Sequence, residues 1–476
     1  MLVSCGFFNL FLDIFLEQNI LRPSKIPVEI SVNFFNTPYI SVKMQNRKNN
    51  TLNSVVVDII KIYTSTNAKM DVVMAEYFAS SNDPFRSGAE AIILQWLRNA
   101  SLIDAAVKSL CAKRPKNGVL AVLRAAAADI MSGEKERLPK IVHNWVDFAK
   151  ERLSKNEGGF VNAVLRRLPE AIEKLCGDLT DARSLSIKYS HPQWLIEKWT
   201  KNFGTQKTVE ILESNRIPSE VFFRKSPARE ADEIFENYRR FFVESKFDGF
   251  FKLKNGCWKN VRPLLDTPYF YIQDPSTLFA PREFAPSDGE YLDLCAAPGG
   301  KSRAIADIVS ENAKRPENSL LVSVDLTDRI LPLRENIAKI SAVKTAIEEC
   351  DILGENLAEK LAAQNLPVLF DGVFVDAPCS NTGVLRRRPD ARYRLKKSDI
   401  AECAKKQLQI LECAKNFVKV GGKLEYSTCS IEKEENGEVL EKFLSANGNF
   451  ALENSSILVP SIENDGAGYA LLRRIS

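Results

Sequence analysis

Histidine is nearly absent from this chain of 476 residues, which has only His143 and His191. Neither lies near a recognisable motif, so we interpret both as packing or surface residues and do not expect histidine acid–base catalysis. A zinc-type spacing of Cys or Cys and His is also missing, and we expect no metal. The ten cysteines run from Cys5 to Cys429 without paired spacing, which predicts reduced thiols in the cytoplasm.

The sequence also lacks a strong excess of charge and a long uninterrupted apolar run. Its 65 basic and 61 acidic side chains leave a net charge of only +4, so a surface for nucleic acid must be a local patch. The apolar stretch 2–21 contains Asp13 and Glu17, and no basic residue precedes Arg22. That pattern fits neither a signal peptide nor a membrane-spanning helix. We interpret residues 1–69 as a poorly ordered extension and expect no membrane contact.

The remainder predicts three further domains. Residues 70–179 carry apolar positions three and four residues apart, which is typical of an all-helical bundle. Residues 180–266 mix short helical and β-like runs, which favours a small α+β module. From residue 267 to 476, strands alternate with helices, which predicts a parallel, doubly wound α/β sheet with ligands at the carboxyl ends of its strands.

A loop of small residues follows the predicted strand at residues 291–296 and opens a helix. Its backbone can approach a ligand closely, and a helix N-terminus favours negative charge. Asp325 ends the next predicted strand and could accept hydrogen bonds from ribose hydroxyls, while Asp351 ends a third predicted strand and could contact an adenine amino group. Taken singly, each aspartate could equally be a helix cap. The candidate cofactor residues here are Cys295, Ala296, Ala297, Pro298, Gly299, Gly300, Lys301, Asp325 and Asp351.

Two cysteine loops follow later strands, Asp376-Ala377-Pro378-Cys379-Ser380 and Tyr426-Ser427-Thr428-Cys429-Ser430. A thiolate that adds to carbon 6 of cytosine makes carbon 5 nucleophilic enough to take a methyl group. An acid at the ring nitrogen helps that addition, and Asp376 lies beside one cysteine. The residues alone do not say which cysteine attacks. The plain alternative is that both are small buried hydrophobes, as we expect for Cys295, Cys350, Cys403 and Cys413.

On these motifs the chain resembles the RsmB-type (Sun or Fmu) 16S ribosomal RNA cytosine-5 methyltransferases of the NOL1/NOP2/Sun family, from about Ala75 onward. The segment Phe160-Val161-Asn162-Ala163-Val164-Leu165-Arg166 is similar to the family's NusB-like RNA-binding domain, and Gln273-Asp274-Pro275-Ser276 to the entry of its Rossmann-like catalytic domain.

The resemblance implies S-adenosylmethionine as methyl donor. Residues 295–301 would line its amino-acid part, Asp325 would hold the ribose, Asp351 would contact the adenine, and Asp376 would lie between cofactor and cytosine. Cys429 would be the nucleophile and Cys379 would assist release, while Lys301 would touch the base. The implied partner is 16S rRNA, and we expect a monomer.

Two departures from the family pattern concern RNA affinity and target: Asn381 stands where Gly or Ala is usual, and Arg224-Lys225-Ser226 lacks an expected asparagine. The run Leu385-Arg386-Arg387-Arg388-Pro389-Asp390 favours phosphate contact. In the small module, basic and aromatic residues suggest either RNA contact or a solvated face: Arg224, Lys225, Arg239, Arg240, Phe241 and Phe242. Alternatives for the whole chain are a tRNA cytosine-5 methyltransferase and a non-catalytic RNA-binding or ribosome-assembly factor. A cysteine hydrolase lacks a histidine partner.

Overall fold

The computed structural model describes residues 51–79, 84–177 and 181–476, which divide into two compact units. One unit holds residues up to Arg216 together with Arg388–Arg394, and the other holds Ile217–Arg387 and Leu395–Ser476. In the described residues, no helix is long and apolar enough to span a membrane.

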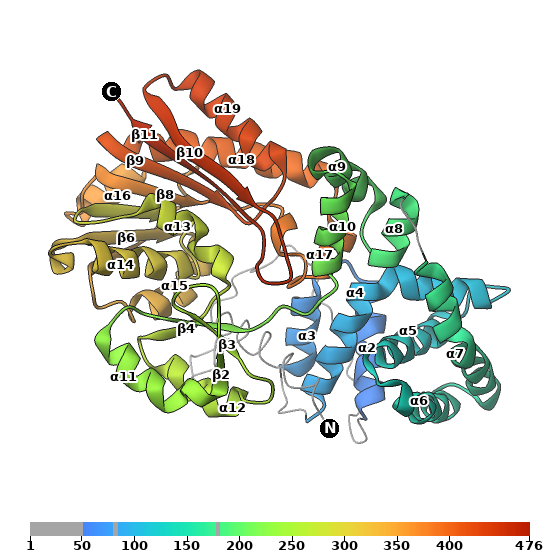
Figure 1. The fold of residues 1–476 in the computed structure, drawn as a ribbon. Helices are drawn as coiled ribbons and strands as arrows, with labels where there is room; N and C mark the ends of the chain where they lie inside the picture. The colour runs from blue at the N-terminus through green and yellow to red at the C-terminus, as the bar shows by residue number, and fades with distance from the viewer. Residues whose placement is uncertain (1–50, 80–83, 178–180) are drawn as a thin grey trace, which may run out of the picture. The chain divides into compact units, whose positions relative to one another are not determined.

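The first unit is a helical bundle (Figure 1). Its helices are α2 (Leu52–Ser65), α3 (Met70–Phe78), α4 (Arg86–Leu110), α5 (Asn117–Ser132), α6 (Leu138–Arg152), α7 (Lys155–Leu175), α8 (Ala182–Tyr189), α9 (Gln193–Phe203), α10 (Thr205–Ser214) and the short α17 (Ala391–Arg394). Helix α7 begins where Ser154 Oγ accepts a hydrogen bond from the Glu157 N–H, and it buries Val161, Leu165 and Leu168 at helical spacing. The predicted bundle is therefore present.

Helix α2 corrects the expected extension of residues 1–69. Thr51 and Ser54 cap its start with reciprocal hydrogen bonds, and Val55 and Ile59 are fully buried in the bundle core. Ordered structure thus begins well before residue 70, because this amphipathic helix has a core to bury its apolar face against. Residues 1–50 of the expected extension lie outside the described residues. Helices α8 to α10, which we had expected in the small module, also group with the bundle.

The short helix α17 belongs to the bundle although it follows the Pro-Cys loop in sequence. The Arg392 side chain is fully buried and donates to the backbone oxygens of Tyr189 (3.3 Å) and Asn215 (3.1 Å). Tyr393 Oη donates to Leu97 O at 2.6 Å. Residues 388–394 are thus fixed to the helical unit by hydrogen bonds to main-chain oxygens.

The second unit contains two sheets (Figure 1). The smaller is antiparallel, in the order β2-β3-β1-β4. Its first three strands lie in the predicted α+β module of residues 180–266, whereas β4 lies beyond residue 266. The elements of this region are β1 (Phe222–Lys225), α11 (Arg229–Tyr238), β2 (Phe242–Glu244), β3 (Phe250–Leu253), α12 (Trp258–Val261) and β4 (Phe270–Ile272).

The larger sheet has seven strands in the order β10-β11-β9-β8-β5-β6-β7. Strands β5 to β9 are parallel, and β10 and β11 form an antiparallel edge. The strands are β5 (Glu290–Leu294), β6 (Leu320–Asp325), β7 (Lys344–Glu349), β8 (Phe370–Asp376), β9 (Val418–Thr428), β10 (Phe450–Leu458) and β11 (Ala467–Arg474). This is the predicted doubly wound sheet. Its strand order reverses between β5 and β8, where such sheets bind ligands.

Alternate residues of the central strands face different helices. Val373 and Val375 of β8 pack in the core that includes α16 (Leu357–Ala363), α18 (Lys397–Ala414) and α19 (Gly437–Ala446). Phe374, between them, packs in the other core, with α13 (Phe279–Phe284) and α14 (Gly300–Asn312). Helix α15 (Ile330–Ile337) packs against the loop that follows β5. Because side chains alternate along a strand, the sheet is buried on both faces and its chemistry is left to the strand ends.

Candidate active site

The carboxyl edge of the larger sheet collects the motifs that the sequence singled out. The cofactor loop follows β5, Asp325 ends β6, Asp376 ends β8, and Cys429 follows β9 directly. Strands β5 and β8 are neighbours, and so are β8 and β9. The cofactor loop and both cysteine loops therefore meet at the point where the strand order reverses.

The cofactor loop turns sharply into α14 at Gly299, whose φ of 102° is a conformation that only glycine adopts without strain. The Ala297 N–H donates to Asp325 Oδ2 at 2.7 Å, so the loop is tied to the end of β6. Helix α14 then begins at Gly300, and the N–H groups of its first turn point out of the helix end. The loop thus presents backbone donors at a positive helix terminus.

Asp325 and Asp351 occupy different environments. The Asp325 side chain is buried, and that burial raises the pKa of its carboxyl group, while Arg329 and two backbone N–H donors oppose the shift. Asp351 is exposed two residues beyond β7, where its Oδ1 accepts from the Leu353 N–H at 3.1 Å. Asp325 is therefore part of the loop architecture, and Asp351 caps its own turn.

Lys301, in the first turn of α14, reaches across to β8 and β9. Its Nζ contacts Asp376 Oδ1 and donates to Ser427 Oγ at 2.9 Å. Burial lowers the pKa of the ammonium, but the Asp376 carboxylate more than offsets this, and the pKa of Lys301 lies above its ordinary value. A stable positive charge therefore lies beside Asp376, and it interacts electrostatically with both Cys379 and Cys429.

The two predicted cysteines form a close pair, with Cys379 Sγ and Cys429 Sγ 2.9 Å apart. All nine cysteines in the described residues are free thiols. The hydrogen bond to Cys429, then burial, then the negative charges of Cys429 and Glu435 raise the pKa of the Cys379 thiol well above its ordinary value. Cys379 therefore holds its proton more tightly than a free thiol does.

Asn381 completes a ring of hydrogen bonds around this pair. Its Nδ2 donates to Cys379 O at 2.8 Å, which turns its Oδ1 toward Cys429 Sγ at 3.1 Å. With the Cys429 S–H donated to Asn381, the Cys379 S–H is left to donate to Cys429. Asn381 has a φ of 61°, and asparagine tolerates this left-handed region better than most residues. The departure noted in the sequence therefore keeps a glycine-like turn and adds an amide beside a thiol.

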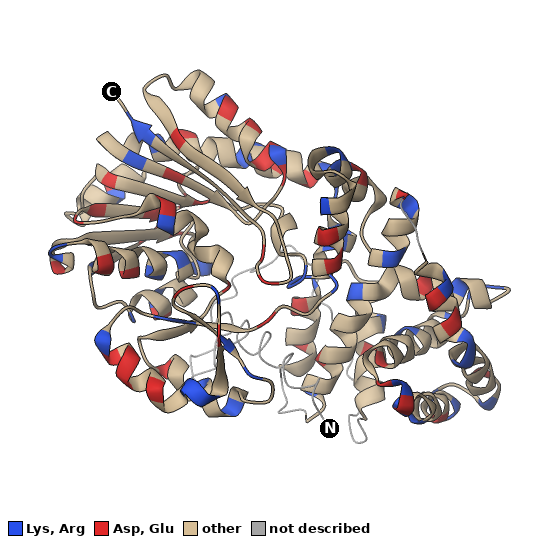
Figure 2. Ribbon diagram, in the orientation of Figure 1, with Lys and Arg blue, Asp and Glu red and all other residues tan. Residues whose placement is uncertain are grey.

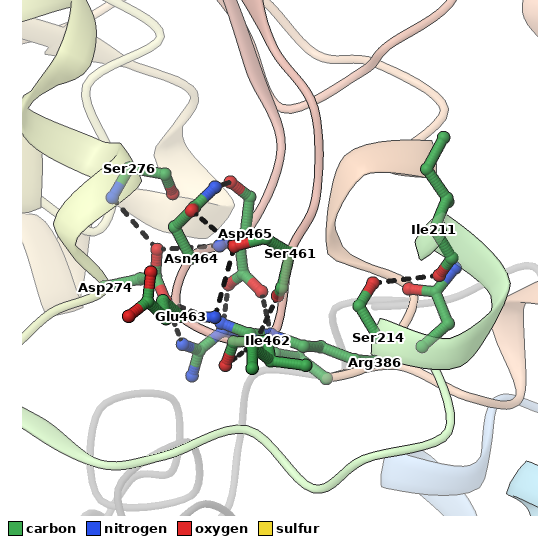
Figure 3. Close-up of polar contacts among 12 residues, drawn as sticks. Ile211, Ser214, Asp274, Ser276, Arg386, Ser461, Ile462, Glu463, Asn464 and Asp465 are labelled. Atoms are coloured by element: carbon green, nitrogen blue, oxygen red, sulfur yellow. Dashed lines mark hydrogen bonds and ion pairs between the residues drawn. The ribbon is translucent and has the colours of Figure 1, made fainter. Parts of the chain in front are cut away.

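The first arginine of the run after the Pro-Cys loop is buried, which corrects the expected phosphate contact for Arg386, whereas Arg388 is exposed. Arg386 is only 1% exposed, and it bonds Asp465 Oδ1 (2.5 Å) and Asp274 Oδ2 (3.2 Å), as Figure 3 shows. Arg387 pairs with the same two carboxylates. Both guanidinium groups therefore hold the Pro-Cys loop to two distant segments of the catalytic unit. Burial among carboxylates leaves Arg386 unable to meet a phosphate.

Three basic residues of the small module pair with carboxylates, and Arg224 does so with a residue of α14, outside the module. Arg224 is buried, pairs with Asp307 and donates to Gln273 Oε1 at 2.8 Å. Lys225 pairs with Asp232 at 2.5 Å, and Arg239 pairs with two glutamates. Acidic positions dominate α11 (Figure 2). Of the proposed basic RNA contacts, Arg224 is excluded by its burial, and these carboxylates neutralise Lys225 and Arg239.

Sequence reasoning missed Glu435. This buried glutamate lies six residues after Cys429 and bonds both cysteine loops. It also missed Gly383, whose N–H donates to Cys429 O at 3.0 Å and whose O accepts from the Gly466 N–H at 2.8 Å. The sequence signal for Glu435 was that a serine directly follows the cysteine in both loops, because two serine hydroxyls at equivalent positions can donate to one shared acceptor.

Comparison with known proteins identifies both parts of the chain. Residues 281–474 match the family model described as 16S rRNA methyltransferase RsmB/F, and residues 52–170 match the NusB family. Residues 281–474 are a methyltransferase domain of the RsmB/F family. The resemblance drawn from the motifs is confirmed for this domain and for the NusB domain that precedes it.

Relatives extend the similarity across most of the chain. It is 29% identical over 385 residues to the probable ribosomal RNA small subunit methyltransferase B of Bacillus subtilis (strain 168), covering 78% of this chain and 82% of that protein. The ribosomal RNA small subunit methyltransferase B of Erwinia tasmaniensis is 29% identical over 328 residues, covering 66% of this chain and 72% of that protein. The solved structure of PH0851 shares the fold, with a TM-score of 0.64 and 22% identity over 89% of this chain and 99% of that one.

S-adenosylmethionine is the methyl donor expected of this domain, and the donor set at the sheet edge fits it. Its carboxylate suits the N–H groups at the start of α14. Carboxylates suit its ammonium and its ribose hydroxyls, and Asp325 and Asp376 end the two strands that flank β5. The N–H groups of the loop and the Asp325 carboxylate together therefore supply the donors and the acceptor that S-adenosylmethionine needs.

Proposed function

We propose that this chain transfers a methyl group from S-adenosylmethionine to carbon 5 of a cytosine in 16S rRNA, through a covalent bond between Cys429 and carbon 6. The observation that carries the proposal is the thiol pair of Cys379 and Cys429, 2.9 Å apart and next to the Lys301–Asp376 ion pair. Relatives called ribosomal RNA small subunit methyltransferases support the substrate class.

In this proposal Cys429 acts as a thiolate, since only the thiolate is nucleophilic. Lys301 interacts electrostatically with Cys429, so a positive charge lies near the attacking sulfur. The sulfur adds to carbon 6, and the ring nitrogen that gains electron density takes a proton from Asp376, which first receives that proton from the Lys301 ammonium, because a carboxylate alone can only accept. The cofactor supplies the methyl group on a sulfonium, which carbon 5 attacks. An unpaired base is required, because carbon 6 is inaccessible within a stacked helix.

Release of the methylated RNA requires the bond between the Cys429 sulfur and carbon 6 to break. Carbon 5 must lose its proton to a base, and the electrons of that C–H bond then expel the Cys429 sulfur from carbon 6. We assign assistance in this step to Cys379, whose sulfur lies against that of Cys429. Its raised pKa keeps it a thiol, which can donate its proton to the departing Cys429 sulfur, while water takes the proton from carbon 5.

Two variants test these roles. Cys429→Ala should abolish methyl transfer while S-adenosylmethionine binding, measured by calorimetry, stays intact, because the alanine lies outside the cofactor loop. Cys379→Ala should form the bond to RNA but release it slowly, so a protein–RNA adduct should persist on a denaturing gel. Cys413→Ala, a cysteine of α18 away from both loops, is the matched control. Normal turnover by Cys429→Ala would overturn the nucleophile assignment.

Bisulfite sequencing of RNA from cells with and without the gene tests the substrate. A cytosine of 16S rRNA should lose its protection from bisulfite when the gene is deleted. Loss of protection in tRNA instead would show that the substrate is tRNA, and the proposed reaction at carbon 5 of cytosine would stand. No change in any RNA, with purified protein also inactive, would favour the non-catalytic assembly factor.

A further inference from the structure

One buried carboxylate joins the two cysteine loops. Ser380 directly follows Cys379, and Ser430 directly follows Cys429. Both serine hydroxyls donate to the same oxygen, Glu435 Oε2, with Ser430 Oγ at 2.5 Å. The Ser380 N–H donates to the other oxygen, Oε1, at 2.8 Å. Each reactive sulfur is therefore one residue away from a hydrogen bond to one shared side chain.

The surroundings of Glu435 hold that side chain in place. Its own backbone oxygen accepts from Tyr426 Oη at 2.6 Å. The Gln407 side chain donates to Glu435 Oε1 (3.1 Å) and to Pro378 O (3.0 Å), so α18 braces both the carboxylate and the Pro-Cys loop. Glu435 is 0% exposed. Burying a carboxylate is costly unless hydrogen bonds satisfy it, and here the donors come from the segments that carry the cysteines.

We propose that Glu435 is a positioning residue that sets the separation of the Cys379 and Cys429 thiols and keeps Cys379 protonated. The role of Glu435 in catalysis rests on the proposed function, whereas the separation of the two sulfurs and the protonation of Cys379 can be measured independently of it. Hydrogen bonds to Ser380 and Ser430 fix the backbone on the C-terminal side of each cysteine. The negative charge of Glu435 also disfavours a second negative charge on Cys379.

The spacing can be measured without RNA, using phenylarsine oxide. Two adjacent thiols displace its oxygen as water and form two arsenic–sulfur bonds, with no change in oxidation state. Wild-type protein should be bridged rapidly, and Cys379→Ala and Cys429→Ala should not. Glu435→Gln keeps the shape but not the charge, and it should be bridged about ten to a hundred times more slowly, the fold-change that corresponds to losing one charge-assisted hydrogen bond. Glu438→Gln, exposed in α19, is the matched control and should react as the wild type does.

The pH at which the Cys379 thiol reacts is a second measurement, and it should not change if Glu435 has only a structural role. In a Cys429→Ala background, alkylation of the peptide containing Cys379 is followed by mass spectrometry across pH. Adding Glu435→Gln should shift the alkylation profile to lower pH, because removing the carboxylate charge removes one cause that raises the pKa of this thiol. In methyl transfer, kcat of Glu435→Gln should fall by about tenfold or more while the KM for S-adenosylmethionine stays constant.

Several outcomes would overturn the inference. Wild-type bridging rates and an unshifted alkylation profile in a folded Glu435→Gln protein would show that the carboxylate sets neither property. If that variant does not fold, Ser380→Ala with Ser430→Ala decides, since the pair removes both hydroxyl donors and leaves the buried charge bonded by the Ser380 N–H and Gln407. Unchanged bridging in that double variant would equally refute the role. A different outcome separates the two proposals. If Glu435→Gln is bridged more slowly but the wild type methylates no RNA, the positioning role of Glu435 stands and the proposed function is refuted.

Discussion

Replacing Asp293 with asparagine removes a carboxyl group from the middle of β5, two residues before the cofactor loop. The side chain is 0% exposed, and its Oδ2 accepts from Ser302 Oγ at 2.5 Å. Burial, and to a lesser degree the charges of Asp376 and Asp325, raise the pKa of Asp293 to about 7, against the opposing effects of Ser302 and Lys301. Asparagine keeps the size of the side chain and an oxygen for Ser302, and it cannot ionise.

The shift from 3.8 to about 7 makes the stability of the wild type depend on pH. In the unfolded chain Asp293 ionises above 3.8, whereas the folded protein keeps the proton up to about pH 7. Its contribution to stability is therefore fully present below 3.8 and is lost as pH rises through about 7. At about 1.4 kcal/mol per pKa unit the whole window is worth about 4 kcal/mol, and the part between pH 5 and pH 7 about 3 kcal/mol.

Urea unfolding at pH 5, 6, 7 and 8, followed by circular dichroism, measures this difference. The free energy of unfolding of Asp293→Asn minus that of the wild type should rise by about 3 kcal/mol between pH 5 and pH 8. Subtraction cancels the other titrating groups. Parallel curves for Asp293→Asn and the wild type would refute the argument that burial keeps this carboxyl protonated.

Two further predictions concern how the Pro-Cys loop is held. In Gly383→Ala the new Cβ would lie 2.7 Å from two backbone oxygens, one of them that of Cys429. We therefore expect kcat to fall at least tenfold and the free energy of unfolding to fall by about 1–3 kcal/mol. The control Gly437→Ala places its Cβ in open space and should change neither quantity. Arg386→Met removes one of the two guanidinium groups that pair with the buried Asp465 carboxylate and leaves Arg387 as the other, and urea unfolding should show a loss of about 1.5–3 kcal/mol. The slope of RNA affinity against salt should be unchanged for Arg386→Met, and a slope reduced by about 1 would reinstate the phosphate contact.

The sheet and its reactive edge could be predicted from the sequence because the informative residues follow strands directly. Once the strands are parallel, their carboxyl ends meet, and Asp376, Cys379 and Cys429 are brought together by topology alone. Partners far apart in sequence could not be predicted in this way. Arg386 stands 112 positions from Asp274, so its carboxylate partner could not be recognised in the sequence, and phosphate contact was favoured instead. Glu435 was missed similarly, since it bonds a serine 55 residues away.

The constraints on the thiol pair bear on how a base could enter. A separation of 2.9 Å between the sulfurs leaves no room for a pyrimidine ring between them. The backbone of both loops is fixed, by Glu435 through the two serines and by Gly383 through Cys429 O. A ring that bonds the Cys429 sulfur must therefore approach from the side away from Cys379, or the Cys379 side chain must rotate about its own χ1. Either route leaves the loops where they are, so the site would be preorganised for sulfur attack and would not be assembled by the RNA.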